Sequence, residues 1–239
     1  DGVRPLTRKL WEAIKAQELP AVAFINKMDR DRADFNMAFD GLSSVLGIRT
    51  VLLYMPIGGQ EDFKGLVDVL GGKALFFEAD GKVSEGDIPA DMADDVEVLR
   101  ETTVENIAES DEDLMEKYLE EGELSEEDLL AGLKIGVKSG ELVPVCVGSA
   151  LENKGGAQLL DTIQSLLSSP LEGRTWQDAE GAERKPDPAE PVAAVCIKTL
   201  ADPFAGQLSI MRVLSGTFSA DTAYKNATKD DNERVGQLL

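Results

Sequence analysis

Three polar side chains follow directly on a short apolar run near the start of the chain. The run is AVAFI at residues 21–25, and Asn26, Lys27 and Asp29 come after it. A carboxylate has two acceptor oxygens that match the paired N1–H and N2–H₂ donors of guanine, whereas adenine presents a different edge. We therefore expect Asp29 to select guanine, Asn26 to hold the loop and reach the other edge of the base, and the Lys27 stem to cover the ring.

An ordinary strand-to-helix turn would explain the same residues, because an N-K-x-D match arises by chance in roughly one chain of this length in thirty. A second polar loop makes chance a weaker explanation. Gly148, Ser149 and Ala150 follow the apolar run LVPVCV at residues 142–147, and their backbone N–H groups could donate to guanine O6. Proteins of the α/β class bind ligands at the carboxyl ends of buried strands, so two such loops together favour a guanine site.

The residues that would hold phosphates are missing from this pattern. A nucleoside triphosphate needs a glycine-rich loop with Lys, and a Ser or Thr for Mg²⁺. Gly72-Lys73 is followed by Ala74, and Val67 takes the place of the first glycine. The short pattern Asp-x-x-Gly occurs after the base loop, which we interpret as coincidence, at Asp62, Asp68 and Asp178. The sequence therefore predicts base recognition without catalytic or metal-ligating residues.

Charge is unevenly distributed along the 239 residues, whose net charge is −21. Between Glu85 and Asp128 there are 19 Asp or Glu residues against Arg100 and Lys117 alone, a local balance of −17. So acidic a surface repels phosphate backbones, and we expect it to avoid nucleic acid, although it could dock a basic protein. A set of solvated helix faces is the alternative. The chain has no His, which leaves carboxylates, backbone groups or a bound ion for any chemistry.

Hydropathy favours a cytoplasmic protein. No apolar stretch approaches the ~20 residues that span a bilayer, and we see no charged-then-apolar leader, so neither membrane insertion nor export is expected. Cys146 and Cys196 each lie in an apolar run and are far apart in the sequence. We expect two buried free thiols rather than a disulfide or a metal site.

Apolar periodicity predicts two strand-turn-helix units of an α/β fold. A helix through Leu6, Leu10 and Ile14 precedes the strand at 21–25. The next helix, over residues 35–46, has Asp34 as a possible N-cap and Gly47 as a possible end. The second unit is the strand at 142–147 followed by a helix with a stripe of apolar residues at Leu159, Leu160, Ile163, Leu166 and Leu167.

The segment between these units is predicted to mix strands and helices. VLLYMPI at 51–57 is typical of one strand, and Asp80-Gly81 is typical of a hairpin turn. Ser110 and Ser125 are candidate helix starts. Two apolar helical stripes follow, at Met92, Val96, Leu99, Thr103 and Ile107 and at Leu129, Leu130, Leu133 and Val137.

The pattern changes again after Pro170. Residues 170–191 are rich in Pro, Gly, Glu and Asp, which is typical of a linker. Short strands then alternate with turns, as in a small barrel or sandwich: VAAVCIK, LSIMRVL, TAYKN and ERVGQLL. Because the last of these strands is apolar and ends the chain, we expect an incomplete domain whose edge strand could pair with a neighbour and give a non-native dimer.

Six separated blocks carry a resemblance to a known family. The blocks are GVRPLTRKLWEAI, FINKMDRDRADF, MPIGGQEDFKGLVDV, DIPADM, GSALENKGGAQLLD and KTLADPFAGQLSIMRVLSGTF. The chain resembles bacterial elongation factor G, a family of translational GTPases that move tRNA and mRNA through the ribosome, or its close paralogues. Two departures from the usual pattern, Glu152 in place of Lys and Gly156-Ala157 in place of a "GVQ" stretch, put the particular paralogue in doubt more than the nucleotide.

The resemblance implies a domain plan and a site. Asn26, Lys27 and Asp29 would be the guanine-reading loop, and Ser149 and Ala150 the second base loop. The implied domains are the C-terminal half of a P-loop GTPase domain at 1–47 and 141–170, an inserted acidic α+β subdomain at 48–140, a linker at 171–190, and the beginning of an antiparallel β-barrel domain at 191–239.

The resemblance also implies ligands and partners. GTP or GDP would be the bound nucleotide, with Mg²⁺ ligands outside these residues, so this chain alone should not hydrolyse GTP. The ribosome would be the partner, including the stalk protein through the acidic insert, and we expect a monomer that binds no DNA. Two alternatives stay open: a paralogue with a ribosome-protection, recycling or regulatory role, and a nucleotide-independent binding module whose acidic helices are its whole purpose.

Overall fold

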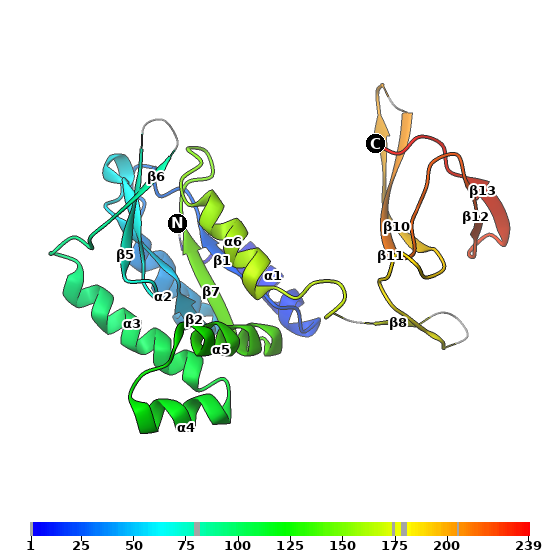
Figure 1. Ribbon diagram of the computed structural model, residues 1–239. Helices are drawn as coiled ribbons and strands as arrows, with labels where there is room; N and C mark the ends of the chain where they lie inside the picture. Colours follow the sequence, from blue (N-terminus) through cyan, green and yellow to red (C-terminus); the bar gives the residue numbers. More distant parts are fainter. Residues whose placement is uncertain (1, 79–81, 174, 178–180, 205) are drawn as a thin grey trace. The chain divides into compact units, whose positions relative to one another are not determined.

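The chain folds into two compact units. The computed structural model describes residues 2–78, 82–173, 175–177, 181–204 and 206–239. Unit 1 is Asp1–Leu167 and unit 2 is Ser168–Leu239, and Figure 1 shows both units with many of their elements labelled. Asp80-Gly81 and Asp178, which the sequence singled out, lie outside the described residues. Within the described part, no helix combines the length and the apolar character needed to cross a bilayer.

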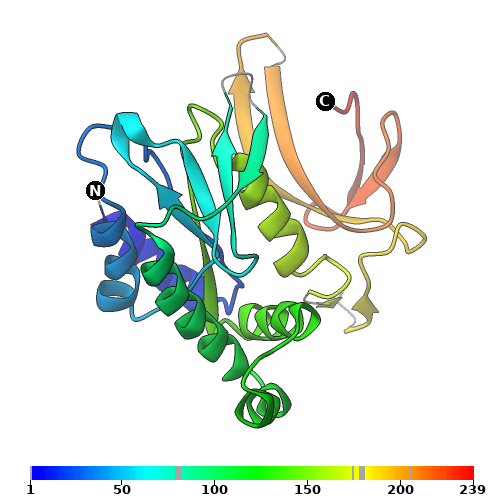
Figure 2. The ribbon, with the colours of Figure 1, turned by 60° about the vertical axis from the view of Figure 1, so that its left-hand side comes forward.

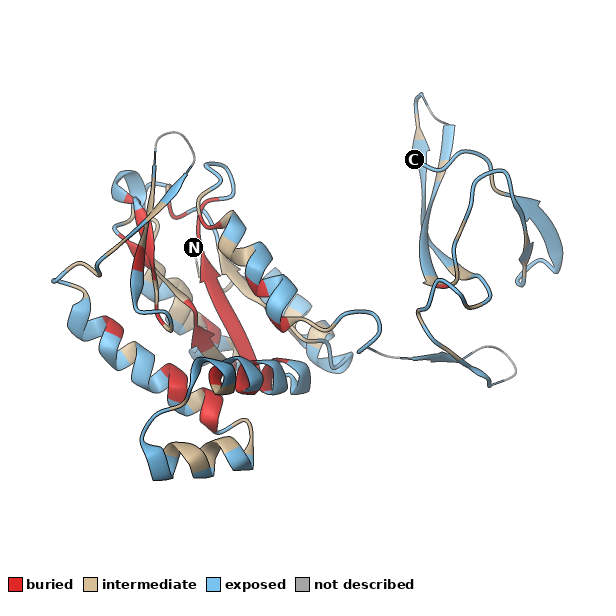
Figure 3. Cartoon of the chain, viewed as in Figure 1, coloured by how far each residue is buried: buried red, intermediate tan, exposed pale blue. Residues whose placement is uncertain are grey.

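A three-stranded parallel sheet forms the centre of unit 1, in the order β1-β7-β2. Its strands are β1 (Ala23–Ile25), β7 (Leu142–Val147) and β2 (Arg49–Leu52). Every residue of the middle strand β7 is buried, as Figure 3 shows. Side chains alternate between the two faces of the sheet, so an apolar run such as LVPVCV is what a strand covered on both faces requires.

Helices cover both faces of this sheet. On one face Leu142 and Cys146 pack against α3 (Ala93–Ala108), α5 (Glu126–Ser139) and α6 (Gly156–Leu166). On the other face Val145 and Val147 pack against α2 (Phe35–Leu46). Figure 2 shows the blue α2 and the yellow-green α6 on opposite sides of the strands. The α/β fold class expected from the sequence is confirmed.

The first helices begin and end near the predicted residues. Helix α1 (Pro5–Ala16) starts with a proline, whose missing N–H costs nothing in the first turn. Helix α2 starts where Asp34 Oδ1 accepts the Met37 N–H at 2.9 Å, and ends at Gly47, whose φ of 64° is left-handed. Both end signals of α2 were predicted and are confirmed.

The predicted single strand at 51–57 is wrong, because the chain changes sheet at Leu53. The Leu53 N–H donates to Val145 O of the parallel sheet at 3.1 Å, and its carbonyl accepts the Val69 N–H at 3.0 Å. Beyond it, β3 (Tyr54–Ile57) belongs to a separate antiparallel sheet. Seven consecutive apolar residues give no sign of such a change, since both strands are buried.

The antiparallel sheet has the order β3-β4-β5-β6. It continues with β4 (Gly65–Asp68), β5 (Lys73–Phe77) and β6 (Val83–Gly86), and helix α3 packs Val96 against Ile57 and Val67 of this sheet. Strand β2 lies inside the stretch that the sequence assigned to the insert, yet it pairs with β7. The predicted boundary between the GTPase domain and the insert at residue 48 therefore does not coincide with the edge of the sheet, and the division into domains stays a prediction.

The acidic helices bury most of their predicted stripes. Thr103 and Ile107 of α3 are buried, as are Leu129, Leu133 and Val137 of α5, whereas Leu130 is exposed. The predicted helix start at Ser125 is confirmed, and Ser125 and Asp128 form a capping box there.

The predicted helix start at Ser110 is wrong by one residue. Asp111 caps α4 (Glu112–Glu121) by accepting the N–H groups of Asp113 and Leu114. The Ser110 hydroxyl instead donates to the carbonyls of Ile107 and Gly132, which ties the end of α3 to α5.

An ion pair at the start of α5 predicts acid sensitivity. Lys117 Nζ lies 2.6 Å from Asp128 Oδ2, and with the Ser125 hydroxyl it lowers the pKa of Asp128 from 3.8 to about 2. A carboxylate with a lowered folded-state pKa stabilises the fold above its unfolded pKa, and that stability is lost as the pH falls toward 2. Asp128→Asn should therefore lower the free energy of unfolding at pH 7 and make it fall less steeply between pH 4 and 2.

Urea unfolding followed by circular dichroism measures this effect. Glu127→Gln is the matched control, because it removes a charge from the same helix turn and keeps the Lys117–Asp128 pair. Equal pH profiles for the two variants would contradict the assignment.

Unit 2 consists of antiparallel hairpins. A short hairpin of β8 (Trp176–Gln177) and β9 (Glu183–Arg184) lies within the predicted linker. The other strand pairs are β10 (Ala193–Asp202) with β11 (Gly206–Ser215), and β12 (Ala223–Asn226) with β13 (Asp231–Arg234). Antiparallel β structure was expected here, but the predicted last strand is wrong at its apolar end, because residues 235–239 form no strand.

The two thiols lie in different environments. Cys146 is buried in β7, and its burial raises the pKa of its thiol, whereas Cys196 on β10 is exposed, so the expectation of two buried thiols is wrong for Cys196. We expect a thiol reagent to label one cysteine of the native 239-residue chain rapidly and the second only after denaturation. Peptide mapping identifies the labelled residue, and rapid labelling of Cys146 would contradict the packing of β7.

Candidate base-binding site

Two loops meet at the carboxyl edge of the parallel sheet. Ile25 pairs with Val147 in the register of β1 and β7, so Asn26 and Gly148 leave the sheet side by side. Two backbone hydrogen bonds tie the loops together: the Gly148 N–H donates to Ile25 O at 3.0 Å, and the Met28 N–H donates to Gly148 O at 3.2 Å. The structure thus brings the two predicted base loops to one place.

Asn26 joins the two loops through its side chain. Its Oδ1 accepts the Lys27 N–H at 2.7 Å and the Ala150 N–H at 2.9 Å. Because both partners are donors, the amide orientation is fixed, and the NH₂ group is the end that can donate to a base. Asn26 therefore ties the second loop to the first.

Asp29 is a partly buried acceptor whose Oδ1 atom is buried and unpaired among the described residues. Its side chain is 11% exposed, and its Oδ1 has no hydrogen-bond partner among the described residues. The Ser149 hydroxyl is the main cause that holds the pKa of Asp29 below its usual value, with further help from Arg30 and Lys154, while burial opposes. Asp29 is therefore ionised at neutral pH, and a buried acceptor of this kind gains most from an external N–H donor.

The second loop uses its own N–H groups differently from the prediction. The Ser149 N–H donates to Lys154 O at 2.9 Å, and the Ala150 N–H is held by Asn26. The sequence offered the N–H groups of Gly148, Ser149 and Ala150 to guanine O6, and the Gly148 N–H too has a protein acceptor, Ile25 O. In the structure each already has a protein acceptor, so a bond from Ala150 to O6 requires Asn26 to share that donor.

Met28 and Lys27 fix the shape of the first loop. The Met28 side chain is 3% exposed and packs in the core with Val145 and Val147, which anchors the loop. Lys27 has a φ of 66°, a left-handed conformation that costs a residue with a Cβ about 1 kcal/mol. Its side chain is exposed beside the loop, where it can lie over the face of a ring.

Two glycines allow the second loop to close tightly. A Cβ on Gly148 would overlap the carbonyl oxygen of Lys154 and come within 2.9 Å of the Phe24 ring. Gly155 has a φ of 78°, and a Cβ there would overlap the carbonyl oxygen of Val147. The path of this loop therefore requires glycine at both positions.

The sequence did not reveal that a third segment, the turn between β3 and β4, contacts both base loops. The Gln60 N–H donates to Met28 O at 2.7 Å, and Lys154 Nζ donates to Phe63 O at 2.9 Å. Both contacts involve the turn at 58–64 between β3 and β4. Gly58-Gly59 is a pair typical of a turn, but nothing in the sequence shows that this turn lies against the base loops.

Metal ions in proteins are commonly held by groups of His, Cys, Asp and Glu side chains. The described residues contain no group of three or more such side chains arranged to hold a metal ion. One of the three Asp-x-x-Gly aspartates, Asp68, accepts the Gly71 N–H at 2.9 Å and so closes a local turn. These residues do not fit Mg²⁺. A cavity of about 660 Å³ borders Asn26 and Lys27, but Asp29 does not line it, so we do not assign it to the base.

An α/β sheet with two polar loops at its carboxyl edge is the arrangement expected of a guanine-nucleotide-binding domain. Residues 1–169 match the family described as the elongation factor Tu GTP binding domain, and the chain belongs to this family. It is therefore related to GTPases that bind guanine nucleotides.

Two relatives show where the chain fits within longer proteins. It is 37% identical over 245 residues to elongation factor G of Ureaplasma urealyticum serovar 10 (strain ATCC 33699 / Western), with 100% of the chain and 36% of that protein covered. The crystal structure of ttk003000868 from Thermus thermophilus superimposes with a TM-score of 0.79 at 27% identity, covering 98% of this chain and 33% of that one. The chain spans about a third of the length of these relatives, and the resemblance to elongation factor G is confirmed.

Proposed function

We propose that this chain is the guanine-reading part of a longer translational GTPase. We call that protein, which would have the length of the relatives, the full-length protein. In the cytoplasm that protein would couple GTP hydrolysis to the movement of tRNA and mRNA on the ribosome. One observation carries the proposal: the Asp29 carboxylate, which the Ser149 hydroxyl stabilises, has an Oδ1 without a hydrogen-bond partner among the described residues, and a carboxylate suits the N1–H and N2–H₂ donors of guanine.

The proposed roles of the site residues follow from their contacts. Asp29 accepts from the Watson–Crick edge of guanine, and the Asn26 NH₂ group donates to the opposite edge. Ser149 keeps the Asp29 carboxylate ionised and oriented, Ala150 offers its N–H to O6, and the Lys27 stem covers the ring. Mg²⁺ would neutralise charge on the nucleotide phosphates, and the residues that hold it would lie in other parts of the full-length protein.

Ribosome-stimulated GTP hydrolysis by the full-length protein tests this function. The proposal predicts phosphate release that depends on both ribosomes and Asp29. Hydrolysis without movement of mRNA would favour a paralogue with a protection, recycling or regulatory role. No dependence on guanine nucleotide would favour the acidic binding module.

The 239-residue chain alone is expected to bind GDP only weakly and to hydrolyse no GTP. Base contacts leave only a few kcal/mol after the cost of ordering the ligand, so we expect a Kd weaker than about 1 mM. Isothermal titration with GDP measures it. Micromolar binding would contradict the proposal that the phosphate-holding groups lie elsewhere.

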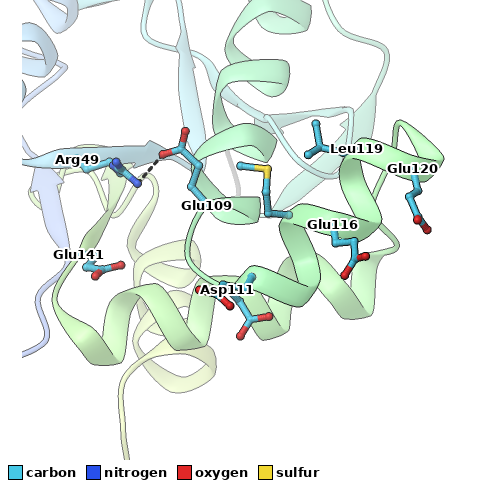
Figure 4. A pocket seen from close by; sticks show the side chains of 9 residues that line it. Arg49, Glu109, Asp111, Glu116, Leu119, Glu120 and Glu141 are labelled. Atoms are coloured by element: carbon cyan, nitrogen blue, oxygen red, sulfur yellow. Dashed lines mark ion pairs between the residues drawn. The ribbon is translucent and has the colours of Figure 1, made fainter.

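A groove on the acidic helices favours a protein partner. It encloses about 870 Å³, and Met115 and Leu119 of α4 supply its apolar surface, Leu119 being 76% exposed. Figure 4 shows the surrounding side chains, where Arg49 pairs with Glu109 at 2.8 Å. The acidic residues that line it are Glu109, Asp111, Glu112, Glu116, Glu120 and Glu141. Such a groove is complementary to a basic segment with apolar anchors, and we propose the ribosomal stalk protein as its partner.

Charge reversal in this groove tests the partner. The double variant Glu116→Lys, Glu120→Lys should weaken binding of the full-length protein to the stalk protein at least tenfold at low salt, because two attractive contacts become repulsive. Glu97→Lys on α3, which does not line the groove, is the control. Equal binding by both variants would remove the groove from the proposal.

A further inference from the structure

The turn at 58–64 lies against both base loops and contacts each of them. On the side of the first loop, the Gln60 N–H donates to the Met28 carbonyl at 2.7 Å. The Phe63 side chain is 1% exposed and packs in the same core cluster as Met28. Gly58, with a φ of 73°, allows the turn to fold back on Asp62, where a Cβ would overlap the Asp62 carbonyl. This turn is therefore a rigid support for the first loop.

Lys154 connects the same turn to the second loop. Its Nζ donates to the Phe63 carbonyl at 2.9 Å and lies 2.7 Å from Glu152 Oε2. The same ammonium group lies 5.7 Å from the centroid of the Phe63 ring. With a side chain only 27% exposed, Lys154 is a partly buried cation with three defined partners rather than a mobile surface residue.

The backbone of Lys154 shapes the part of the loop that faces Asp29. Its N–H donates to Ser149 O at 3.0 Å, and its carbonyl accepts the Ser149 N–H at 2.9 Å. These two bonds form an antiparallel bridge, so a displacement of Lys154 also displaces Ser149. Ser149 is buried and its hydroxyl interacts with the Asp29 carboxylate. Hydrogen bonds thus link Phe63 to Lys154 and Lys154 to Ser149, and the Ser149 hydroxyl in turn stabilises the Asp29 carboxylate.

We propose that Lys154 is a positioning residue for guanine recognition. By tying the second loop to the Phe63 carbonyl, Lys154 sets the alignment of Ser149 and Asp29. The inference rests on the proposed function, because it concerns the same base site. It assigns Lys154 no contact with the nucleotide. Its consequence is specific: losing the ammonium group should impair the reading of the 2-amino group of the base more than nucleotide binding in general.

The test compares GDP with IDP, whose hypoxanthine base lacks only that 2-amino group. In the full-length protein, Lys154→Met keeps the side-chain stem and removes the charge, while Lys154→Arg keeps a cationic donor. The matched control is Lys64→Met, an exposed lysine of the same turn. Kd values for both nucleotides come from displacement of a fluorescent GDP analogue, and thermal melting verifies that each variant is folded.

We expect Lys154→Met to reduce the ratio of the IDP Kd to the GDP Kd about tenfold, the equivalent of one hydrogen bond to a charged group. The Lys154→Arg variant should stay near the wild-type ratio, as should Lys64→Met. Should Lys154→Met fail to fold, Lys154→Gln, which retains a donor without the charge, should show a reduced ratio in its place.

Two results would overturn the inference: an unchanged ratio in folded Lys154→Met or Lys154→Gln, or equal weakening of GDP and IDP binding in these variants, as a purely structural role would give. Failure of the proposed function has a different signature, because the wild-type protein itself would then bind GDP and IDP equally.

Discussion

Replacing Asp29 with Asn in the full-length protein is expected to lower its affinity for GDP about a hundredfold and to raise its affinity for XDP. The carboxylate accepts from two N–H donors of guanine, and hydrogen bonds to a charged group contribute about 1.5–3 kcal/mol each. An Asn side chain presents one donor and one acceptor instead. Xanthine, which carries a carbonyl oxygen where guanine has its amino group, matches that pattern.

Displacement of a bound fluorescent nucleotide by GDP and by XDP measures the Kd of each, and so shows whether the variant prefers XDP. Asp31→Asn is a suitable control, because it removes the same charge two residues away, in the same polar segment. The proposal that Asp29 reads the base would be wrong if Asp29→Asn bound GDP as tightly as Asp31→Asn does.

Gly148→Ala is the second substitution with a large expected effect. The new methyl group would overlap the Lys154 carbonyl oxygen and press on the Phe24 ring, both of which belong to packed structure. Overpacking of this kind costs about 1–3 kcal/mol of stability. Because the Gly148 carbonyl also accepts the Met28 N–H, the same shift should separate the two base loops.

Chemical denaturation and GDP titration of the full-length protein check both consequences. Gly59→Ala serves as the control, since a Cβ there has no neighbour within 4 Å and the backbone is extended. We expect Gly59→Ala to bind GDP normally and Gly148→Ala to bind at least about tenfold more weakly, as for one lost hydrogen bond. Normal stability and binding by Gly148→Ala would contradict the close approach of the loops.

The local signals in the sequence located the elements that hold the site. Asp34 and Gly47 marked the ends of α2 because a side-chain cap and a left-handed glycine act within a few residues. The apolar runs before Asn26 and Gly148 marked two strands of the parallel sheet, of which β7 is buried and β1 is partly buried. Since parallel strands end at the same edge of a sheet, the meeting of the two polar loops could also be foreseen.

Contacts between distant segments could not be foreseen in this way. Leu53 changes sheet because it bonds to Val145 on one side and Val69 on the other, and neither partner is close to it in sequence. The support of the site by Lys154 and Phe63 joins residues that are 91 positions apart. Cys196 lies in an apolar run that resembles the one around Cys146, yet only the latter occupies a strand covered on both faces.

The central claim is that Asp29 reads guanine in a protein that moves mRNA on the ribosome. The most direct test is to measure translocation of mRNA on stalled ribosomes by the full-length protein, in the presence of either GTP or XTP. The account predicts movement by one codon with GTP for the wild-type protein, and with XTP but not GTP for Asp29→Asn. A wild-type protein that leaves the mRNA in place, or an Asp29→Asn variant that moves it with GTP at the wild-type rate, would contradict the account.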